Sequence, residues 1–376
     1  MLSSIHLHSR TNRRRFAVSA AVAVLTVFFA VGCVSVESSE PIGAVAGDAG
    51  TELSDRAVAD DVFVNPILPS GADPWVILHE GLYYYTVSDG RRTIFLSATE
   101  DFTRLSEARS LPVYAAEPGT DHSDHVWAPE LHFFEGRWYL YFSADGGEIF
   151  EHRVFVARTA DDDPFGEYEY VGPLVPNEET FNIDGTVWRA PDGQYYCFWS
   201  GWTTTRLEGQ HIFASAMNGP ERATGEPVLI SSPEYRWEAA WPHPPVNEAP
   251  QIIENDDLVH LVFSASAYFF PKYCLGLLTM DREANPLDPD SWTKYPEPVF
   301  RRANEVRGPG HASFTTSPDG TEWWIIYHSL VPGNLYHARM INAQQFTWDE
   351  DGYPEFDEPV GSRTSLYRPS GVAETP

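Results

Sequence analysis

The sequence predicts an all-β fold, a five-bladed β-propeller with four antiparallel strands in each blade. Two observations lead to this prediction. A β-prone segment that ends in serine occurs five times, at intervals of 55, 57, 64 and 65 residues. Each copy also lies between two other β-prone runs, as neighbouring strands of one sheet require. Short strands that repeat at a long, nearly fixed period are typical of propellers, in which each repeat forms one blade.

The repeated segment is the expected second strand of each blade. Its five copies end at Ser88, Ser143, Ser200, Ser264 and Ser329. The first copy follows the apolar run 75–78 across a turn that contains Gly81, so the two runs predict an antiparallel hairpin. The expected third strands lie at 93–99, 153–159, 211–217, 273–280 and 335–340.

Each expected first strand begins with a polar side chain. These residues are Asp73, Glu130, Asp184, Glu248 and His311. The first strand of each blade lines the central channel of a propeller. The five side chains are therefore expected to converge on one axis, although they are far apart in the sequence.

Residues 1–33 have the features of an export signal. Four arginines between positions 10 and 15 precede an uncharged apolar run, 17–31, which is shorter than the roughly 20 residues of a spanning helix. Ala30-Val31-Gly32-Cys33 resembles the lipobox of bacterial lipoproteins, whose cysteine becomes lipidated. We therefore expect a lipoprotein-type signal peptide and an exported chain anchored by lipid to the cell envelope, periplasmic or at the cell surface. An uncleaved anchor helix is the alternative.

The rest of the chain divides by composition. Residues 34–61 are small, polar and acidic and predict a flexible tether. Residues 62–365 are rich in aromatic residues and hold all five repeats without a second linker, so they predict a single propeller domain. Residues 366–376 are expected to form a C-terminal tail.

The charge of the chain argues against two classes of partner. The formal net charge is −29, from 54 acidic and 25 basic residues. Without the four signal arginines, 54 acids and 21 bases leave −33. Such a chain repels nucleic acid and anionic membranes, so neither is an expected partner, and membrane contact is expected only through the lipid anchor. The chain has few lysines and an excess of acidic residues. This composition also resembles that of proteins from salt-rich habitats, where salt screens the repulsion between like charges.

Two cysteines, Cys197 and Cys274, lie in expected strands of different blades. Cysteines in apolar strands are most often buried free thiols. An exported protein can also form a disulfide, so we expect free thiols and keep the disulfide as the alternative.

Three of the residues expected on the axis are acids, Asp73, Asp184 and Glu248. Any one of them could simply cap a strand or pair with an arginine. Three acids at equivalent positions of different repeats are better explained by a shared site. Converging carboxylates raise one another's pKa, so one can hold a proton near neutral pH while another remains a base.

Five motifs, in this order, resemble glycoside hydrolase family 43 between Asn65 and Pro359. They are Ala72-Asp73-Pro74-Trp75, Trp127-Ala128-Pro129-Glu130-Leu131-His132, Ile183-Asp184-Gly185, Asn247-Glu248-Ala249-Pro250 and Gly308-Pro309-Gly310-His311. The resemblance implies Asp73 as general base, Asp184 as the residue that raises the pKa of the acid, and Glu248 as general acid. Ala249 departs from the glycine that is usual in the family.

The C-terminal segments 308–314, 317–320 and 348–356 resemble exo-α-L-arabinofuranosidase-like members of that family. The resemblance implies an inverting glycoside hydrolase that releases terminal α-L-arabinofuranosyl residues from arabinan or arabinoxylan oligosaccharides. A β-xylosidase of the same fold remains an alternative, because the two sugars are similar in size. A non-catalytic glycan-binding propeller lipoprotein is another, but it predicts the loss of one of the three acids, and all three are present.

The resemblance also implies a role for His311. In the family the equivalent histidine approaches a central ion, often calcium, through water. We therefore expect Ca²⁺ at the propeller centre with His311 as a water-mediated contact, and no organic cofactor. The cluster Asp121-His122-Ser123-Asp124-His125 is expected to be a polar surface loop rather than a metal site.

Substrate contacts are expected from aromatic rings, which stack on the apolar faces of sugars. Trp75 and Trp127 flank the expected axis and are our candidates. Trp237 and Trp241, in the segment before the fourth acid, could equally pack blades together. Arg339 is a candidate for binding a substrate hydroxyl, with a salt bridge to an acid as the alternative.

Overall fold

The computed structural model describes residues 61–176, 180–333 and 338–373. The predicted signal peptide with Cys33, and the predicted tether up to residue 60, lie outside the described residues. The described residues belong to one compact unit that holds all five repeats. Among the described residues, no helix is both long and apolar enough to span a membrane.

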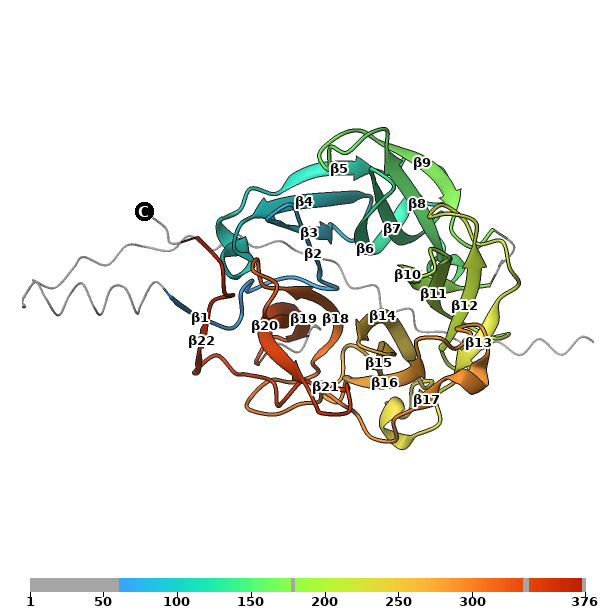
Figure 1. Cartoon of the computed structure of the whole chain (residues 1–376). Coiled ribbons are helices and arrows are strands. Elements are labelled where there is room, and N and C mark those ends of the chain that lie inside the picture. The colour runs from blue at the N-terminus through green and yellow to red at the C-terminus, as the bar shows by residue number, and fades with distance from the viewer. Residues whose placement is uncertain (1–60, 177–179, 334–337, 374–376) are drawn as a thin grey trace, which may run out of the picture. The chain divides into compact units, whose positions relative to one another are not determined.

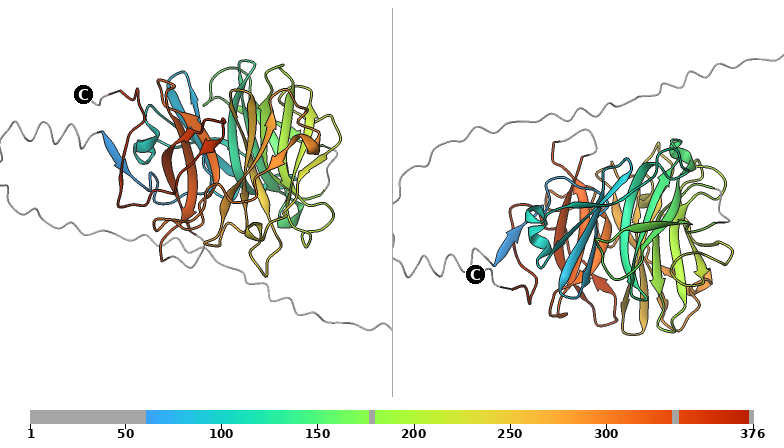
Figure 2. Two further views of the ribbon diagram at one scale, coloured as in Figure 1. Left: turned by 60° about the horizontal axis from the view of Figure 1, so that its bottom comes forward. Right: turned by 90° about the horizontal axis from the view of Figure 1, so that it is seen from above.

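The fold prediction is confirmed, since five sheets of four antiparallel strands lie around a common centre (Figures 1 and 2). In each sheet the strands lie side by side in chain order. Blade 1 comprises β2 (Trp75–His79), β3 (Leu82–Ser88), β4 (Thr93–Thr99) and β5 (Leu111–Ala115), and blade 2 comprises β6 (Asp124–Phe134), β7 (Arg137–Asp145), β8 (Arg153–Thr159) and β9 (Tyr168–Pro173). Blade 3 comprises β10 (Asn182–Arg189), β11 (Tyr195–Gly201), β12 (His211–Met217) and β13 (Val228–Ser231).

The last two blades follow the same pattern. Blade 4 comprises β14 (Asn247–Asn255), β15 (Leu258–Ala265), β16 (Cys274–Asp281) and β17 (Thr293–Lys294), and blade 5 comprises β18 (Gly310–Thr316), β19 (Trp323–Leu330), β20 (Arg339–Trp348) and β21 (Pro354–Glu355). Helix in the described part of the chain is limited to four short 3₁₀ segments, η1 (Phe102–Glu107), η2 (Ile149–Glu151), η3 (Arg236–Glu238) and η4 (Pro289–Ser291).

Apolar side chains pack between neighbouring blades. The buried apolar residues form five clusters, and each draws its members from two adjacent blades. Aromatic residues of the repeated segment fill these clusters; Trp138 and Trp199 are at most 1% exposed. One cluster joins Ile326 of blade 5 to Val76 of blade 1, so the same kind of contact closes the ring. Closure leaves no blade with an apolar face in water.

The repeated serines link one blade to the next. Four of the five use Oγ to bond the first strand of the following blade. These bonds join Ser88 to Val126 O, Ser143 to Asp184 N, Ser200 to Asn247 O and Ser264 to His311 N, over 2.5, 2.9, 2.8 and 2.7 Å. The fifth, Ser329, accepts from Asn342 in its own blade, and the preceding His328 contacts blade 1 instead. Serine recurs because a buried backbone group left without a partner is costly.

The two ends of the propeller meet beside blade 5. β1 (Val62–Val64) pairs antiparallel with β22 (Ser365–Tyr367). The Asn65 side chain exchanges two hydrogen bonds, both of 2.9 Å, with the backbone of Ala343 in β20. Arg368 pairs with Asp101 of blade 1 at 3.1 Å. The domain therefore continues beyond residue 365, where a tail was expected to begin.

Two further expectations have clear outcomes. The third strand of blade 5 was expected at 335–340, but Leu330 pairs with Arg339 and β20 begins there. Of that run, Arg339 and Met340 belong to β20 and Ala338 directly precedes it, whereas 334–337 lie outside the described residues. Cys197 and Cys274 are both buried free thiols, so the disulfide alternative is wrong.

Candidate active site

The first strands approach the axis through a shared backbone irregularity. Each blade has a non-glycine residue with φ between 43° and 54° where its first strand reaches the axis, and blade 2 has a second one, His125, at the start of β6. The five residues at the axis are Asp73, Ala128, Asp184, Ala249 and His311. In blades 2 to 5 the strand register also shifts at this point, as in a β-bulge. Bulges redirect side chains, and left-handed non-glycine residues are concentrated at functional sites.

Four of the five predicted axis residues lie in the wall of one cavity of about 460 Å³: Asp73, Asp184, Glu248 and His311. The predicted substrate contacts Trp127 and Arg339 also line it. The structure thus brings together residues from all five blades.

Glu130 is placed differently from the prediction. Ala128 is the residue of blade 2 that is equivalent to Asp73, and Glu130 lies two positions further along β6. Its carboxyl group contacts His132 at 2.9 Å and accepts a hydrogen bond from Gln251 of blade 4. Glu130 therefore faces the channel, but it is not among the described residues that line the cavity.

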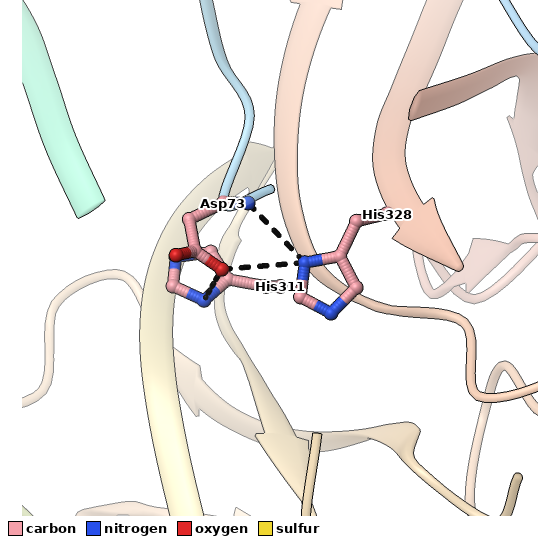
Figure 3. A group of neighbouring side chains, drawn as sticks. All are labelled: Asp73, His311 and His328. Atoms are coloured by element: carbon pink, nitrogen blue, oxygen red, sulfur yellow. Dashed lines mark hydrogen bonds and ion pairs between the residues drawn. The ribbon is translucent and has the colours of Figure 1, made fainter. Parts of the chain in front are cut away.

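Asp73 is held as a carboxylate by positive and polar partners. Its Oδ1 atom lies 2.7 Å from Arg339 Nη1 and 3.3 Å from the Nδ1 atoms of both His311 and His328. Figure 3 shows its carboxyl group between the two imidazole rings. Burial alone would raise the pKa of Asp73, but Arg339 and His311 lower it well below its usual value. Asp73 is therefore ionised at neutral pH.

His328 supports Asp73 as a neutral ring. The backbone N–H of Asp73 lies 3.2 Å from His328 Nδ1, and Asp73 Oδ1 lies 3.3 Å from the same nitrogen. Burial lowers the pKa of His328 to about 3, which agrees with a neutral imidazole. The ring also stacks on Tyr273, with centroids 5.5 Å apart.

Asp184 and Glu248 lie in the opposite electrostatic environment. Burial raises the pKa of both carboxyl groups, and the negative charge of Asp73 raises them further. Tyr273 donates its O–H to Glu248 at 2.7 Å, and the Ala249 N–H donates to Asp184 at 3.1 Å. These bonds favour the ionised forms without offsetting the effect of burial. The pair therefore retains a proton near neutral pH.

The site thus combines a carboxylate with a protonated carboxyl group across one cavity. Environments that push the pKa values of two acids apart identify a general base and a general acid. The arrangement can supply a proton to a leaving oxygen and remove one from an attacking water molecule.

The only candidate metal cluster within the described ranges consists of Asp73, His311 and His328. It does not fit calcium as a direct ligand set, because calcium takes oxygen ligands and this group offers two imidazole nitrogens. The carboxylate oxygen that lies near both rings, Asp73 Oδ1, is already bonded to Arg339. A water-mediated contact of His311 with a calcium ion stays a prediction.

The predicted aromatic contacts separate into two groups. Trp127 lines the cavity and stacks on His152, with centroids 3.9 Å apart. Trp75 instead packs on His132 and donates from Nε1 to the backbone of Leu131, and it is not among the described lining residues. Its strand runs away from the mouth after Asp73, which carries Trp75 into the contact between blades 1 and 2.

The two tryptophans before Glu248 do not line the cavity either, as far as the structure describes it. Trp237 packs on Phe263 and donates to the backbone of Pro296. Trp241 is 89% exposed.

The segment 121–125 is not a metal cluster in the described structure. Asp121 pairs with Arg153 at 2.7 Å. His122 is buried, although a surface loop was expected, because its ring stacks on Tyr170 with centroids 3.9 Å apart.

Several cavity residues were missed in the sequence. Phe150, Trp202 and Tyr268 line the cavity, and Tyr268 lies 4.6 Å from the guanidinium carbon of Arg339. Each follows a repeated serine within seven residues. In blades 2, 3 and 4 the loop after the second strand lines the cavity, so the repeat itself could have identified these loops.

Comparison with known proteins gives consistent results. The profile of the glycosyl hydrolases family 43 matches residues 63–354. The chain is 34% identical over 273 residues to an extracellular exo-alpha-(1->5)-L-arabinofuranosidase of Streptomyces chartreusis, covering 71% of this chain and 82% of that protein. It is 32% identical over 319 residues to a protein of the same name from Streptomyces avermitilis, covering 81% of this chain and 65% of that protein. The chain thus spans just under two thirds of the second relative.

Solved structures resemble the propeller closely. An alpha-L-arabinofuranosidase from Lactobacillus brevis superposes with a TM-score of 0.74 at 30% identity, covering 80% of this chain and 98% of that one. A thermostable family-43 glycoside hydrolase gives a TM-score of 0.68 at 24% identity, covering 80% and 99%. At that identity the second structure supports the fold alone.

Proposed function

Because this chain belongs to the glycosyl hydrolases family 43, we propose that it is an inverting glycosidase that releases terminal α-L-arabinofuranosyl residues from arabinan or arabinoxylan oligosaccharides. Relatives at 34% and 32% identity carry the name exo-α-(1→5)-L-arabinofuranosidase. The observation that carries the proposal is the opposite protonation of Asp73 and Glu248 in one cavity.

In the proposed reaction Glu248 gives its proton to the glycosidic oxygen as that bond breaks. Asp73 takes a proton from a water molecule that attacks the anomeric carbon from the opposite face, so the configuration inverts. The water needs a gap of roughly 6.5–9.5 Å between the two carboxyl groups. Residues of blades 1 and 4 that face one cavity are suited to such a gap.

Asp184 and Arg339 are proposed to maintain these protonation states. Two buried carboxyl groups that interact cannot both ionise easily, so Asp184 favours the protonated form of Glu248. Arg339 keeps Asp73 charged through its 2.7 Å contact. Its remaining N–H groups are proposed to bind a substrate hydroxyl, next to Trp127 on the cavity wall.

The substrate assignment is tested with two nitrophenyl glycosides. We expect a higher kcat/KM on the α-L-arabinofuranoside than on the β-D-xyloside, and a product of inverted configuration by NMR. A preference for the xyloside would favour the β-xylosidase alternative, which the name of a 23% identical xylosidase/arabinosidase from Humicola insolens keeps open. Binding of arabinan without hydrolysis would favour the non-catalytic glycan-binding propeller.

The calcium proposal has its own test. A calcium ion held through water beside His311 should stabilise the folded chain, because it binds the native state alone. A chelator should lower the melting temperature, and added calcium should restore it. An unchanged melting temperature would contradict a bound ion.

The proposed location is the cell envelope. Both Streptomyces relatives are named as extracellular, which supports export. Anchoring through Cys33 predicts that labelled fatty acid enters the wild-type chain and not Cys33→Ser. Equal labelling of both chains would exclude this anchor.

A further inference from the structure

The catalytic cavity extends from the acids towards blades 2 and 3. Phe150, in the β7–β8 connection, and Trp202 and Arg206, in the β11–β12 connection, line it together with Glu248. Its volume is about 460 Å³. One pentosyl residue has nine heavy atoms and fills at most roughly 270 Å³, if each atom is given the share of about 30 Å³ that a water molecule has in the liquid. The cavity therefore has room for more than the terminal sugar.

The wall on this side is built for apolar contact. Trp202 stacks on Phe181, with centroids 4.4 Å apart and planes at 13°, so one face of its ring is supported by protein. Phe150 lies 6.0 Å from Trp202 and is 55% exposed. The guanidinium of Arg206 lies 4.7 Å above the Phe150 ring and is open to solvent. Rings and hydroxyl-binding donors together are suited to a sugar.

The positions of acid and base show which side of the cavity the leaving part of the substrate takes. Glu248 belongs to blade 4 and Asp73 to blade 1. In an inverting reaction the leaving oxygen lies on the side of the acid, opposite the attacking water. Exposed apolar side chains lie in the connections of blades 2 to 4. Phe150 (55%), Leu207 (76%) and Tyr268 (38%) lie between the second and third strands of their blades, and Trp241 (89%) lies between β13 and β14. The corresponding loop of blade 1, 89–92, reads Asp-Gly-Arg-Arg.

We propose that Phe150, Trp202 and Arg206 bind the sugar residue next to the cleaved bond on its leaving side, and that Trp241 contacts the residue after it. This inference rests on the proposed function and extends it to the shape of the substrate. The ligand is a linear pentosyl oligosaccharide of at least three residues, one of which is released. The two indole rings and Phe150 stack on apolar sugar faces, and Arg206 donates to hydroxyl groups.

Binding is tested without turnover, in the Glu248→Gln background. By calorimetry, arabinotriose should bind more tightly than L-arabinose. Adding Trp202→Ala or Phe150→Ala should weaken arabinotriose binding about tenfold and leave L-arabinose binding unchanged. Phe165→Ala is the matched control, because this ring is 38% exposed on the β8–β9 connection and does not line the described cavity. Arabinotriose binding that survives both substitutions would overturn the proposal.

Kinetics provide the second readout. With Glu248 intact, Trp202→Ala should lower kcat/KM on arabinotriose about tenfold and spare methyl α-L-arabinofuranoside, which has no second sugar. An equal loss on both substrates would overturn the proposal, because the residue would then serve the released sugar or the fold. Phe150→Ala repeats the test at a side chain that is 55% exposed, so its removal should not change the stability of the fold. If the wild-type chain cleaves no arabinoside, the proposed function fails, and the calorimetry still decides the binding site.

Discussion

Glu248 and Asp73 are both buried acids, and their different partners decide their protonation. Glu248 has a neutral phenol at 2.7 Å, whereas Asp73 has a guanidinium at the same distance. A hydrogen bond from a neutral group offsets burial only in part, whereas Arg339, His311 and His328 together lower the pKa of Asp73 by more than burial raises it. The different neighbours of the two carboxyl groups therefore separate acid from base.

The two roles can be separated by the leaving group of the substrate. Glu248→Gln should slow hydrolysis of arabinan oligosaccharides by about 10²–10⁴-fold and largely spare aryl glycosides, whose phenolate leaves without a proton. Asp73→Asn should abolish both activities, because its water is always needed. Steady-state kinetics on both substrates measure the contrast, with the exposed Glu297→Gln as control. Equal losses in Glu248→Gln on both substrates would mean that it is not the acid.

Tyr273 should set the upper pH limit of activity. Its O–H stabilises the ionised form of Glu248, so Tyr273→Phe should raise the pKa of that acid further. The acid must be protonated to work, so the alkaline limb of the kcat/KM profile should move to higher pH. Tyr141→Phe is the control, because this buried tyrosine donates to the backbone of Pro220 instead. A limb that stays in place, or moves equally in both variants, would contradict this role.

The three acids could be predicted from the sequence because each lies at the head of the first strand of its repeat: Asp73 and Asp184 hold the left-handed position, and Glu248 directly precedes it. Tyr273 and His328 could not, because their roles depend on contacts that no local pattern records. Tyr273 reaches Glu248 from the connection between β15 and β16, and His328 bonds a residue 255 positions earlier in the chain.

Among the elements, the second strands help to join the blades, because a serine at or near the end of four of them bonds the first strand of the following blade. Ser264 accepts the backbone N–H of His311 at 2.7 Å in a fully buried position. A hydroxyl group near the end of a strand in one blade therefore accepts a hydrogen bond from the first strand of the next blade. This bond also holds one of the cavity residues in place.

Ser264→Ala should lower stability by about 1–3 kcal/mol, since a buried N–H loses its acceptor. The measurement is denaturant or thermal unfolding, and activity should fall as well because His311 is no longer fixed. Ser110→Ala, at an exposed serine, provides the comparison. Equal stability of the two variants would show that the serine bond contributes nothing.

The existence of the strands could be predicted from the repeat, whereas the position of Glu130 in its strand and the start of β20 could not. Glu130 was aligned with Asp73 because each precedes a run of apolar residues. The bulge at Ala128 inserts extra residues into the strand, and the order of polar and apolar residues does not reveal it. Residues 335–340 look like a strand because they are partly apolar, yet the strand that the structure describes begins at Arg339, and 334–337 lie outside the described residues. In both cases hydrogen-bond register, rather than composition, decides.

For the whole molecule, the net charge of −29 opposes the compact state. Raising NaCl from 0.1 to 1 M shortens the screening length from about 10 to about 3 Å, so the melting temperature should rise at neutral pH. At pH 4.6, near the calculated isoelectric point, the same salt should have little effect, because the repulsion is gone. Thermal scans at both pH values measure this. The same rise at both would show that salt acts by another route.

The contact between Arg339 and Asp73 makes ring closure a condition for chemistry. The two residues are 266 positions apart, so a ribosome that adds about 5–20 residues per second delivers the arginine roughly 13–53 s after the aspartate. Until then Asp73 lacks the arginine that keeps its carboxyl group ionised once that group is buried. A chain that stops before β20 can carry four complete blades and still lack Arg339, which lines the cavity beside Asp73. The site is thus complete only when the last blade docks on the first.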